Sequence, residues 1–141
     1  MRKLGIAEEQ QGDRELVVDW LKYLQENQRD YTLGFRELAH RTEDSGESVF
    51  GEFEIRWRKR IGNQETPSEK ITASMNNLNP LFIPRNHRVE EAIRNAVEGD
   101  TQVFHELNQV LAHPFEEQPE FSHYAEEPQP GQRVTATFCG T

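Results

Sequence analysis

The sequence is poor in cysteine, in long hydrophobic runs and in apolar residues generally, and each shortage excludes a class of protein. Its one cysteine, Cys139, excludes a disulfide framework within the chain. No stretch approaches the roughly 18 consecutive apolar residues that a membrane-spanning helix needs. The first residues lack the apolar segment of a secretory signal, so we expect an intracellular, cytoplasmic protein.

Core-forming residues are scarce. Leu, Ile, Val and Phe together account for 32 of the 141 residues, about 23%, just above the roughly 20% below which chains are disordered. We therefore expect either a marginal core or apolar surface that serves another purpose. The formal net charge of −9 repels phosphate groups, which disfavours nucleic acid and anionic membrane surfaces as partners.

Hydrophobic periodicity predicts an all-α fold, a small irregular bundle of five to six helices. Apolar residues recur at three- and four-residue steps, the pattern of amphipathic helices. The predicted helices cover roughly residues 14–28, 49–62, 67–77, 87–98 and 101–112, and a further short helix opens at Asp30–Thr32 with Phe35, Leu38 and Ala39 on its inner side. Gly99 and Asp100 leave room only for a tight turn, which predicts a hairpin of the last two helices.

Local signals predict where several helices begin. Asp13 and Asn86 are expected to cap the helices that follow them, because their side chains can accept from free backbone N–H groups. The stretch Thr66–Glu69 has the form of a capping box, with the threonine as N-cap and proline at the first helical position. Residues 79–84 contain two prolines, Pro80 and Pro84, which predicts an extended connector there.

The composition changes after residue 112. Residues 113–141 hold four of the seven prolines and five glutamates, which predicts an extended Pro/Glu-rich tail that follows a helical segment over 1–112. The tail also contains Phe115, Phe121 and Tyr124. We expect these rings to anchor it along a surface.

No combination of residues predicts a catalytic or metal centre. His105, His113, His123 and Cys139 lack the spacing of a known metal-ligand motif, and the sequence has no glycine-rich phosphate loop. The basic cluster Arg56–Arg60 is interpreted as an ion-paired or solvated helix face, with a binding patch as the alternative.

Short motifs occur in a familiar order along the whole chain. Asn79-Pro80 and Arg85-Asn86 together form an NP-x-x-x-x-RN segment. Further motifs are Arg2–Gly5, Asp30–Arg36, Val89–Ile93, Gly99-Asp100, Phe104–Leu107, His113–Phe115, Gln118–Glu120 and Phe138–Thr141. Individually they are weak, but in this order they are specific, and together they resemble the YdiU/selenoprotein-O family.

The resemblance implies a protein adenylyltransferase, which transfers AMP from ATP to protein hydroxyl groups with Mg²⁺ or Mn²⁺. In the family, the residues that bind nucleotide and metal lie in a larger N-terminal, kinase-like catalytic portion, which this chain is expected to lack. We therefore expect no catalytic residue and no bound cofactor here. The chain would be the C-terminal helical segment, inactive alone, that supports the kinase-like portion.

The resemblance also assigns roles to single residues. Cys139 matches the C-terminal cysteine or selenocysteine of the family, which implies a redox residue whose partner lies in the catalytic portion; the alternative is a vestigial thiol. Asn79, Pro80, Arg85 and Asn86 are expected to be structural, with Asn86 as a helix cap and Arg85 bound to a carboxylate or a carbonyl.

Two other functions stay open on the sequence. One is a stand-alone helical module for interaction or regulation, and the other is a small enzyme that uses Cys139 with a histidine. A segment of a larger enzyme should expose a larger apolar patch than a monomer does, because some of its helix faces would contact the rest of the protein.

Overall fold

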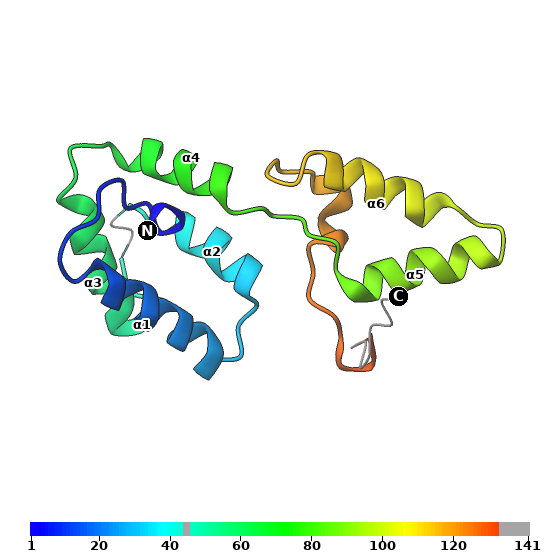
Figure 1. The fold of residues 1–141 in the computed structure, drawn as a ribbon, viewed down its shortest axis with the longest axis horizontal. Helices are drawn as coiled ribbons and strands as arrows, with labels where there is room; N and C mark the ends of the chain where they lie inside the picture. The colour runs from blue at the N-terminus through cyan, green and yellow to red at the C-terminus, as the bar shows by residue number, and fades with distance from the viewer. Residues whose placement is uncertain (44–45, 133–141) are drawn as a thin grey trace. The chain divides into compact units, whose positions relative to one another are not determined.

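Helices form the regular structure throughout the computed structural model, which describes residues 1–43 and 46–132 (Figure 1). Within these residues six α-helices follow one another: α1 (Asp13–Glu26), α2 (Tyr31–Ala39), α3 (Gly51–Gly62), α4 (Ser68–Leu78), α5 (Asn86–Val97) and α6 (Gln102–Ala112). Three short 3₁₀ helices are η1 (Arg2–Leu4), η2 (Pro119–Tyr124) and η3 (Pro130–Gln132). The predicted all-α fold is confirmed.

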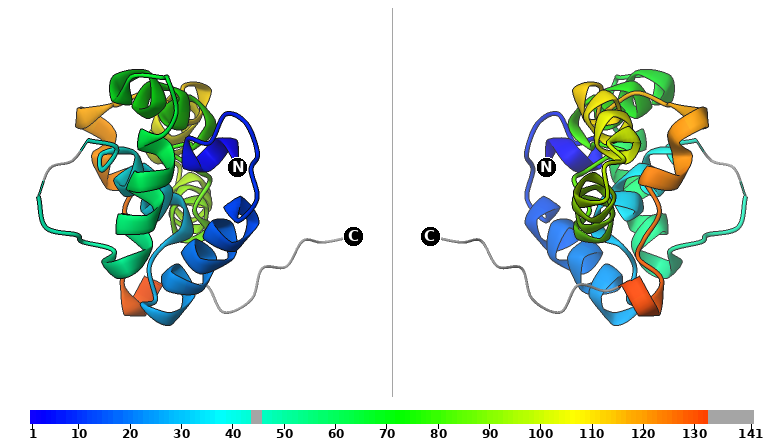
Figure 2. Two further views of the ribbon diagram at one scale, coloured as in Figure 1. Left: turned by 90° about the vertical axis from the view of Figure 1, so that its left-hand side faces the viewer. Right: turned by 90° about the vertical axis from the view of Figure 1, so that its right-hand side faces the viewer.

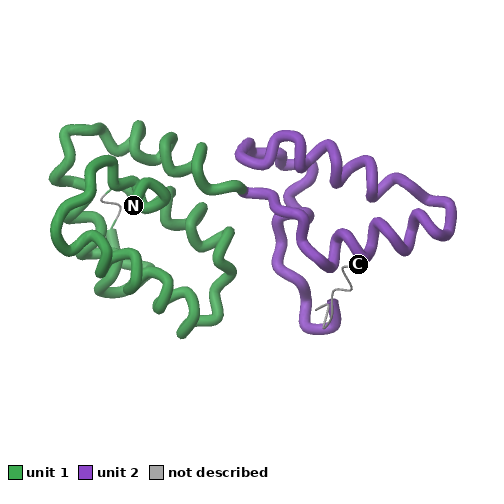
Figure 3. Tube along the Cα trace, in the orientation of Figure 1, with its two compact units in different colours: residues 1–80 green, residues 81–141 purple. Residues whose placement is uncertain are grey.

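The chain forms two compact units, unit 1 from Met1 to Pro80 and unit 2 from Leu81 onward (Figure 3). This division differs from the predicted boundary after residue 112, which rested on the change of composition in the tail. The described part of the tail belongs with α5 and α6 in unit 2. None of the described helices is both long enough and apolar enough to cross a membrane.

Unit 1 is built around two buried tryptophans. Trp20 of α1 stacks on Phe53 of α3, with ring centroids 5.0 Å apart, and meets Phe50 edge-on at 5.1 Å. Helices α1 and α3 accordingly lie side by side (Figure 2). Trp57 donates its indole N–H to the carbonyl of Leu4 at 2.8 Å. This bond satisfies a buried donor and ties η1 to α3.

Helix α4 packs against η1 and α2. Ile71 and Met75 are its buried residues, and both approach Gly5 at the end of η1. Gly5 has φ of +73°, and an added Cβ would lie 2.5 Å from Ile71 Cγ2. The close approach and the left-handed backbone both require glycine at this position.

Two predicted caps of unit 1 are wrong. Helix α4 has Pro67 in its N-cap position instead of Thr66, and no side chain caps it. Asp13 is the first residue of α1, and the preceding glycine is the N-cap. The Asp13 carboxylate instead accepts from Arg60 Nε at 2.7 Å, because a buried carboxylate gains more from a charged donor than from an exposed helix end.

Unit 2 is a helical hairpin of α5 and α6 with an arm, the described residues 113–132, that follows it and packs against it through η2. Helices α5 and α6 pack together and are joined by residues 98–101, where Gly99 has φ of +94°. η2 packs against α6, and Tyr124 is buried there, with its hydroxyl donating to Glu106 Oε2 at 2.8 Å. The expected anchoring of the tail by aromatic rings is therefore confirmed for Tyr124, in a 3₁₀ helix instead of an extended segment.

Replacing Gly34 by alanine should destabilise unit 1. Gly34 lies in α2, and an added Cβ would be 2.6 Å from Leu24 Cδ2, so packed side chains would have to shift. Gly62→Ala is the matched control, because Gly62 is also helical but an added Cβ meets none of the described residues within 4 Å. Both variants gain helix propensity, so the difference between them, about 1–3 kcal/mol, measures the overpacking.

The measurement is urea unfolding followed by the fluorescence of Trp20 and Trp57, which both belong to unit 1. Equal midpoints for Gly34→Ala and Gly62→Ala would contradict the close packing of α1 against α2.

Candidate functional site

The NP-x-x-x-x-RN segment begins at the end of α4. Asn79 is the C-cap of that helix and is fully buried, and its Nδ2 donates to the carbonyl of Lys3 at 2.9 Å. The buried Arg36 donates to the carbonyl of Asn76, one turn earlier, at 3.3 Å. Pro80 follows and is half-buried. Asn79 thus ends α4 and holds the N-terminal turn.

The second half of the segment starts α5 in unit 2. Arg85 is buried and holds the N-cap position, and its carbonyl accepts from Val89 N at 3.0 Å, the first helical bond. Asn86 is already helical and is exposed, so the prediction of Asn86 as cap is wrong. The start of a helix is set by the residue whose backbone carbonyl accepts the first helical hydrogen bond. A polar side chain nearby does not change that position.

His87 is a buried titratable group of the same segment. Its side chain is 7% exposed, and its Nε2 has no hydrogen-bond partner among the described residues. Burial lowers the pKa of His87, the charges of Arg88 and Arg85 lower it further, and Glu91 opposes them. The imidazole is therefore held in its neutral form.

Unit 1 contains a buried carboxylate that the sequence analysis did not identify. Glu54 of α3 is fully buried and accepts from the backbone N–H groups of Val49 and Phe50 at 2.7 and 2.8 Å. It also pairs with Arg41, at 2.7 Å, and with Arg58. Burial by itself would raise the pKa of Glu54, but the hydrogen bonds outweigh it and hold that pKa below its ordinary value.

The predicted basic cluster of α3 is engaged in ion pairs. The pairs are Arg56 with Asp19, Arg58 with Glu54 and Arg60 with Asp13. The latter two acceptors are buried. The contacts favour the ion-paired helix face over the binding patch.

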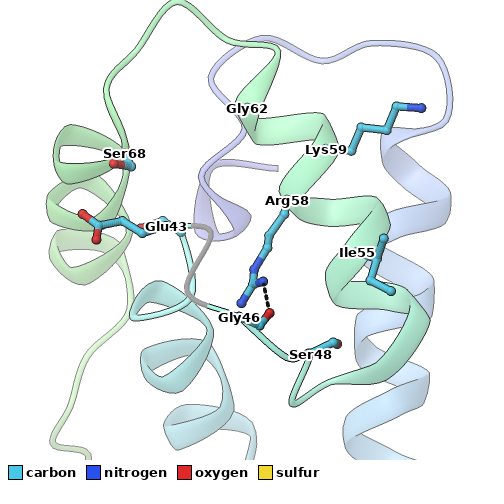
Figure 4. Close-up of a pocket in the computed structure, with 9 residues that line it drawn as sticks. Glu43, Gly46, Ser48, Ile55, Arg58, Lys59, Gly62 and Ser68 are labelled. Carbon is cyan, nitrogen blue, oxygen red and sulfur yellow. Dashed lines mark hydrogen bonds between the residues drawn. The ribbon is translucent and has the colours of Figure 1, made fainter.

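A pocket of about 660 Å³ opens beside α3 in unit 1 (Figure 4). Its lining consists of Thr42, Glu43, Gly46, Ser48, Ile55, Arg58, Lys59, Gly62 and Ser68. Arg58 donates to the carbonyls of Gly46 at 3.2 Å and Arg41 at 3.1 Å besides its pair with Glu54. The guanidinium of Arg58 is thus engaged by groups of the chain itself. This arrangement does not fit a phosphate site, in which the guanidinium would face the ligand.

The described residues contain no group of three or more His, Cys, Asp or Glu side chains that could hold a metal ion. Cys139, the predicted redox residue, lies outside the described residues. The structure therefore places Asn79, Pro80, Arg85 and Asn86 at helix ends and gives no position for the thiol.

The apolar face of the α5–α6 hairpin is only partly covered. Ala92 and Leu107 are buried, whereas Ile93, Val97 and Phe104 are 54%, 84% and 50% exposed. We call these three residues the hairpin patch. The apolar stripes predicted for the two helices are thus divided into a buried part and an exposed part.

Comparison with known proteins identifies the family. The family model described as "Protein adenylyltransferase SelO" matches residues 1–112. A "Protein nucleotidyltransferase YdiU" from Nitrobacter hamburgensis is 44% identical, over 99% of this chain and 30% of the relative. The proteins of that name from Nitrobacter winogradskyi and Bradyrhizobium diazoefficiens are 43% and 42% identical over 99% of this chain, and over 30% and 31% of their own lengths.

The chain belongs to the SelO family. This SelO-family chain spans about 30% of the length of the curated relatives it matches. The family match includes all six α-helices and the NP-x-x-x-x-RN segment. The resemblance inferred from scattered motifs is therefore confirmed.

Replacing Glu54 by glutamine should strongly destabilise unit 1. The change leaves Arg41 and Arg58 beside a neutral amide, and removing one partner of a buried ion pair costs about 3–5 kcal/mol. Because the pKa of Glu54 is lowered from 4.5, its contribution is present above pH 4.5 and is lost as the pH falls through the folded-state pKa. Urea unfolding, followed by tryptophan fluorescence at pH 7 and in acid, measures both effects.

Glu52→Gln is the matched control, because Glu52 lies in the same first turn of α3 but is exposed. Its effect should stay within about 0.5 kcal/mol. If Glu54→Gln and Glu52→Gln unfolded at the same urea concentration at pH 7, the buried network would not stabilise the fold.

Mild acid should destabilise unit 2 through His87. Because the pKa of His87 is lowered from 6.5, its neutral form favours folding fully above pH 6.5, and this stability is lost as the pH falls through the folded-state pKa. Urea unfolding, followed by the amide NMR signals of α5 between pH 7.5 and 5, tests this. His87→Gln should flatten the dependence and His113→Gln, at an exposed histidine, should keep it. An unchanged profile in His87→Gln would refute the assignment.

Proposed function

We propose that this chain is the C-terminal helical segment of a SelO-type protein adenylyltransferase, an enzyme that transfers AMP from ATP to protein hydroxyl groups. The observation that carries the proposal is the coverage: the YdiU relatives match 99% of this chain with only 30% of their own length. Two structural observations fit a role in supporting the rest of the enzyme. The arginines of α3 form ion pairs within the chain, and the residues of the NP-x-x-x-x-RN segment lie at helix ends.

In this proposal the kinase-like portion of the enzyme binds ATP with Mg²⁺ or Mn²⁺. The helical segment supports that portion and presents Cys139 to it as a redox residue, since the chain has no second cysteine to pair with. The cytoplasm is the proposed compartment, because a single thiol fits a reducing environment.

The isolated chain should not transfer AMP. Labelled ATP with Mg²⁺ or Mn²⁺ and a protein substrate should give no labelled protein above the blank, whereas the full-length YdiU of Nitrobacter hamburgensis serves as the positive control. Labelling by the isolated chain would overturn the proposal. Loss of such labelling in Cys139→Ser would then favour the small enzyme that uses this thiol.

A stand-alone interaction or regulatory module is the second candidate, because the exposed hairpin patch would fit a separate protein partner as well as the rest of the enzyme. The coding sequence directly upstream of Met1 distinguishes the two. A kinase-like segment with a glycine-rich loop in the same reading frame would support the enzyme segment, and a terminator preceded by unrelated genes would support the separate module.

A further inference from the structure

The hairpin patch gathers at the turn end of α5 and α6. Ile93 and Val97 are four residues apart and share one face of α5. Phe104 lies in the first turn of α6, just beyond the connecting residues 98–101. The end of one helix and the start of the next thus bring three large apolar side chains to one end of unit 2, each at least 50% exposed.

The arm of unit 2 is held near the start of α5 and against the first half of α6. Arg88, near the start of α5, donates to the carbonyl of His123 at 2.9 Å, and its guanidinium lies 5.6 Å from the ring centre of Tyr124. Val97 is nine residues further along α5, roughly 13 Å at 1.5 Å per residue. On α6 the arm reaches further towards the patch, because Tyr124 donates to Glu106, two residues after Phe104, yet Phe104 itself stays 50% exposed.

The charges around the patch define the chemistry of a partner. Between residues 90 and 106 the hairpin carries five acidic residues and one arginine, Arg94. Single exposed apolar residues are ordinary, but a group of them rimmed by polar residues is typical of a contact surface, and the charged residues here are mostly acidic. A complementary surface would be apolar with a basic rim.

The length of the relatives indicates what covers the patch. About 70% of the YdiU relative from Nitrobacter hamburgensis lies outside the match to this chain, which covers 30% of it. We propose that the hairpin patch is the surface through which the segment packs against that remaining portion, on an apolar face edged by Lys and Arg. This inference rests on the proposed function, and it adds the location and chemistry of the contact.

The test is co-expression of the 141-residue chain with the tagged remaining portion of that YdiU protein, followed by co-purification and titration of the purified partners. A Val97→Glu/Phe104→Glu variant should bind at least tenfold more weakly than the wild type. Ile55→Glu is the matched control, because Ile55 is 62% exposed on α3 of unit 1, and it should bind like the wild type. Circular dichroism of each variant checks that its helices are retained.

The outcomes separate this inference from the proposed function. Binding by the wild type and equally by both variants would overturn the hairpin patch as the contact and leave the proposed function standing. A wild-type chain that fails to bind the remaining portion would overturn both. Self-association of the wild type that the double variant abolishes would show a second copy as the occupant and overturn the inference.

Ionic strength tests the basic rim separately. Because exposed charge pairs are screened by salt, wild-type binding should weaken between 50 mM and 500 mM NaCl. Affinity that does not change with salt would overturn the basic rim.

Discussion

Much of unit 1 depends on one buried carboxylate, that of Glu54. Its bonds to backbone N–H groups fix the chain just before α3, and its ion pair with Arg41 connects α3 with the segment that follows α2. A buried charge is tolerated only when its partners are in place, so these segments are restrained together. One of the fixed residues, Phe50, also contacts the ring of Trp20. The ionic network and the aromatic core are therefore formed by the same piece of chain.

The helices could be predicted from the sequence, but their first residues could not. Apolar spacing depends on many residues, so one error does not move a helix. A cap depends on the backbone of one residue and on what competes for its side chain. Asp13 has the right chemistry for a cap, yet Arg60 from another helix engages it. Asn86 also has that chemistry, yet the carbonyl of Arg85 already begins the helix.

The buried charged residues of unit 1 can be recognised in the sequence by their spacing. A search for apolar residues alone does not find them. Glu54 lies four residues after Phe50 and three before Trp57, so it belongs to the buried stripe of α3. Asp13 lies three residues before Leu16 in the same way. A charged residue on a buried stripe needs a partner, and the arginines of the basic cluster were the available ones. His87 has no such periodic signal, because its burial depends on tertiary packing.

The few apolar residues of the chain are buried to different extents in the two units. The main cluster of buried residues runs from Leu4 to Met75 and lies within unit 1. A hairpin of two helices has too little volume to surround both of its apolar stripes, so part of each stays at the surface unless another element covers it. In unit 2 that other element is the arm with Tyr124, which contacts Arg88 near the start of α5 and Glu106 in α6. Which part of a predicted stripe is buried is thus decided by residues distant in the sequence.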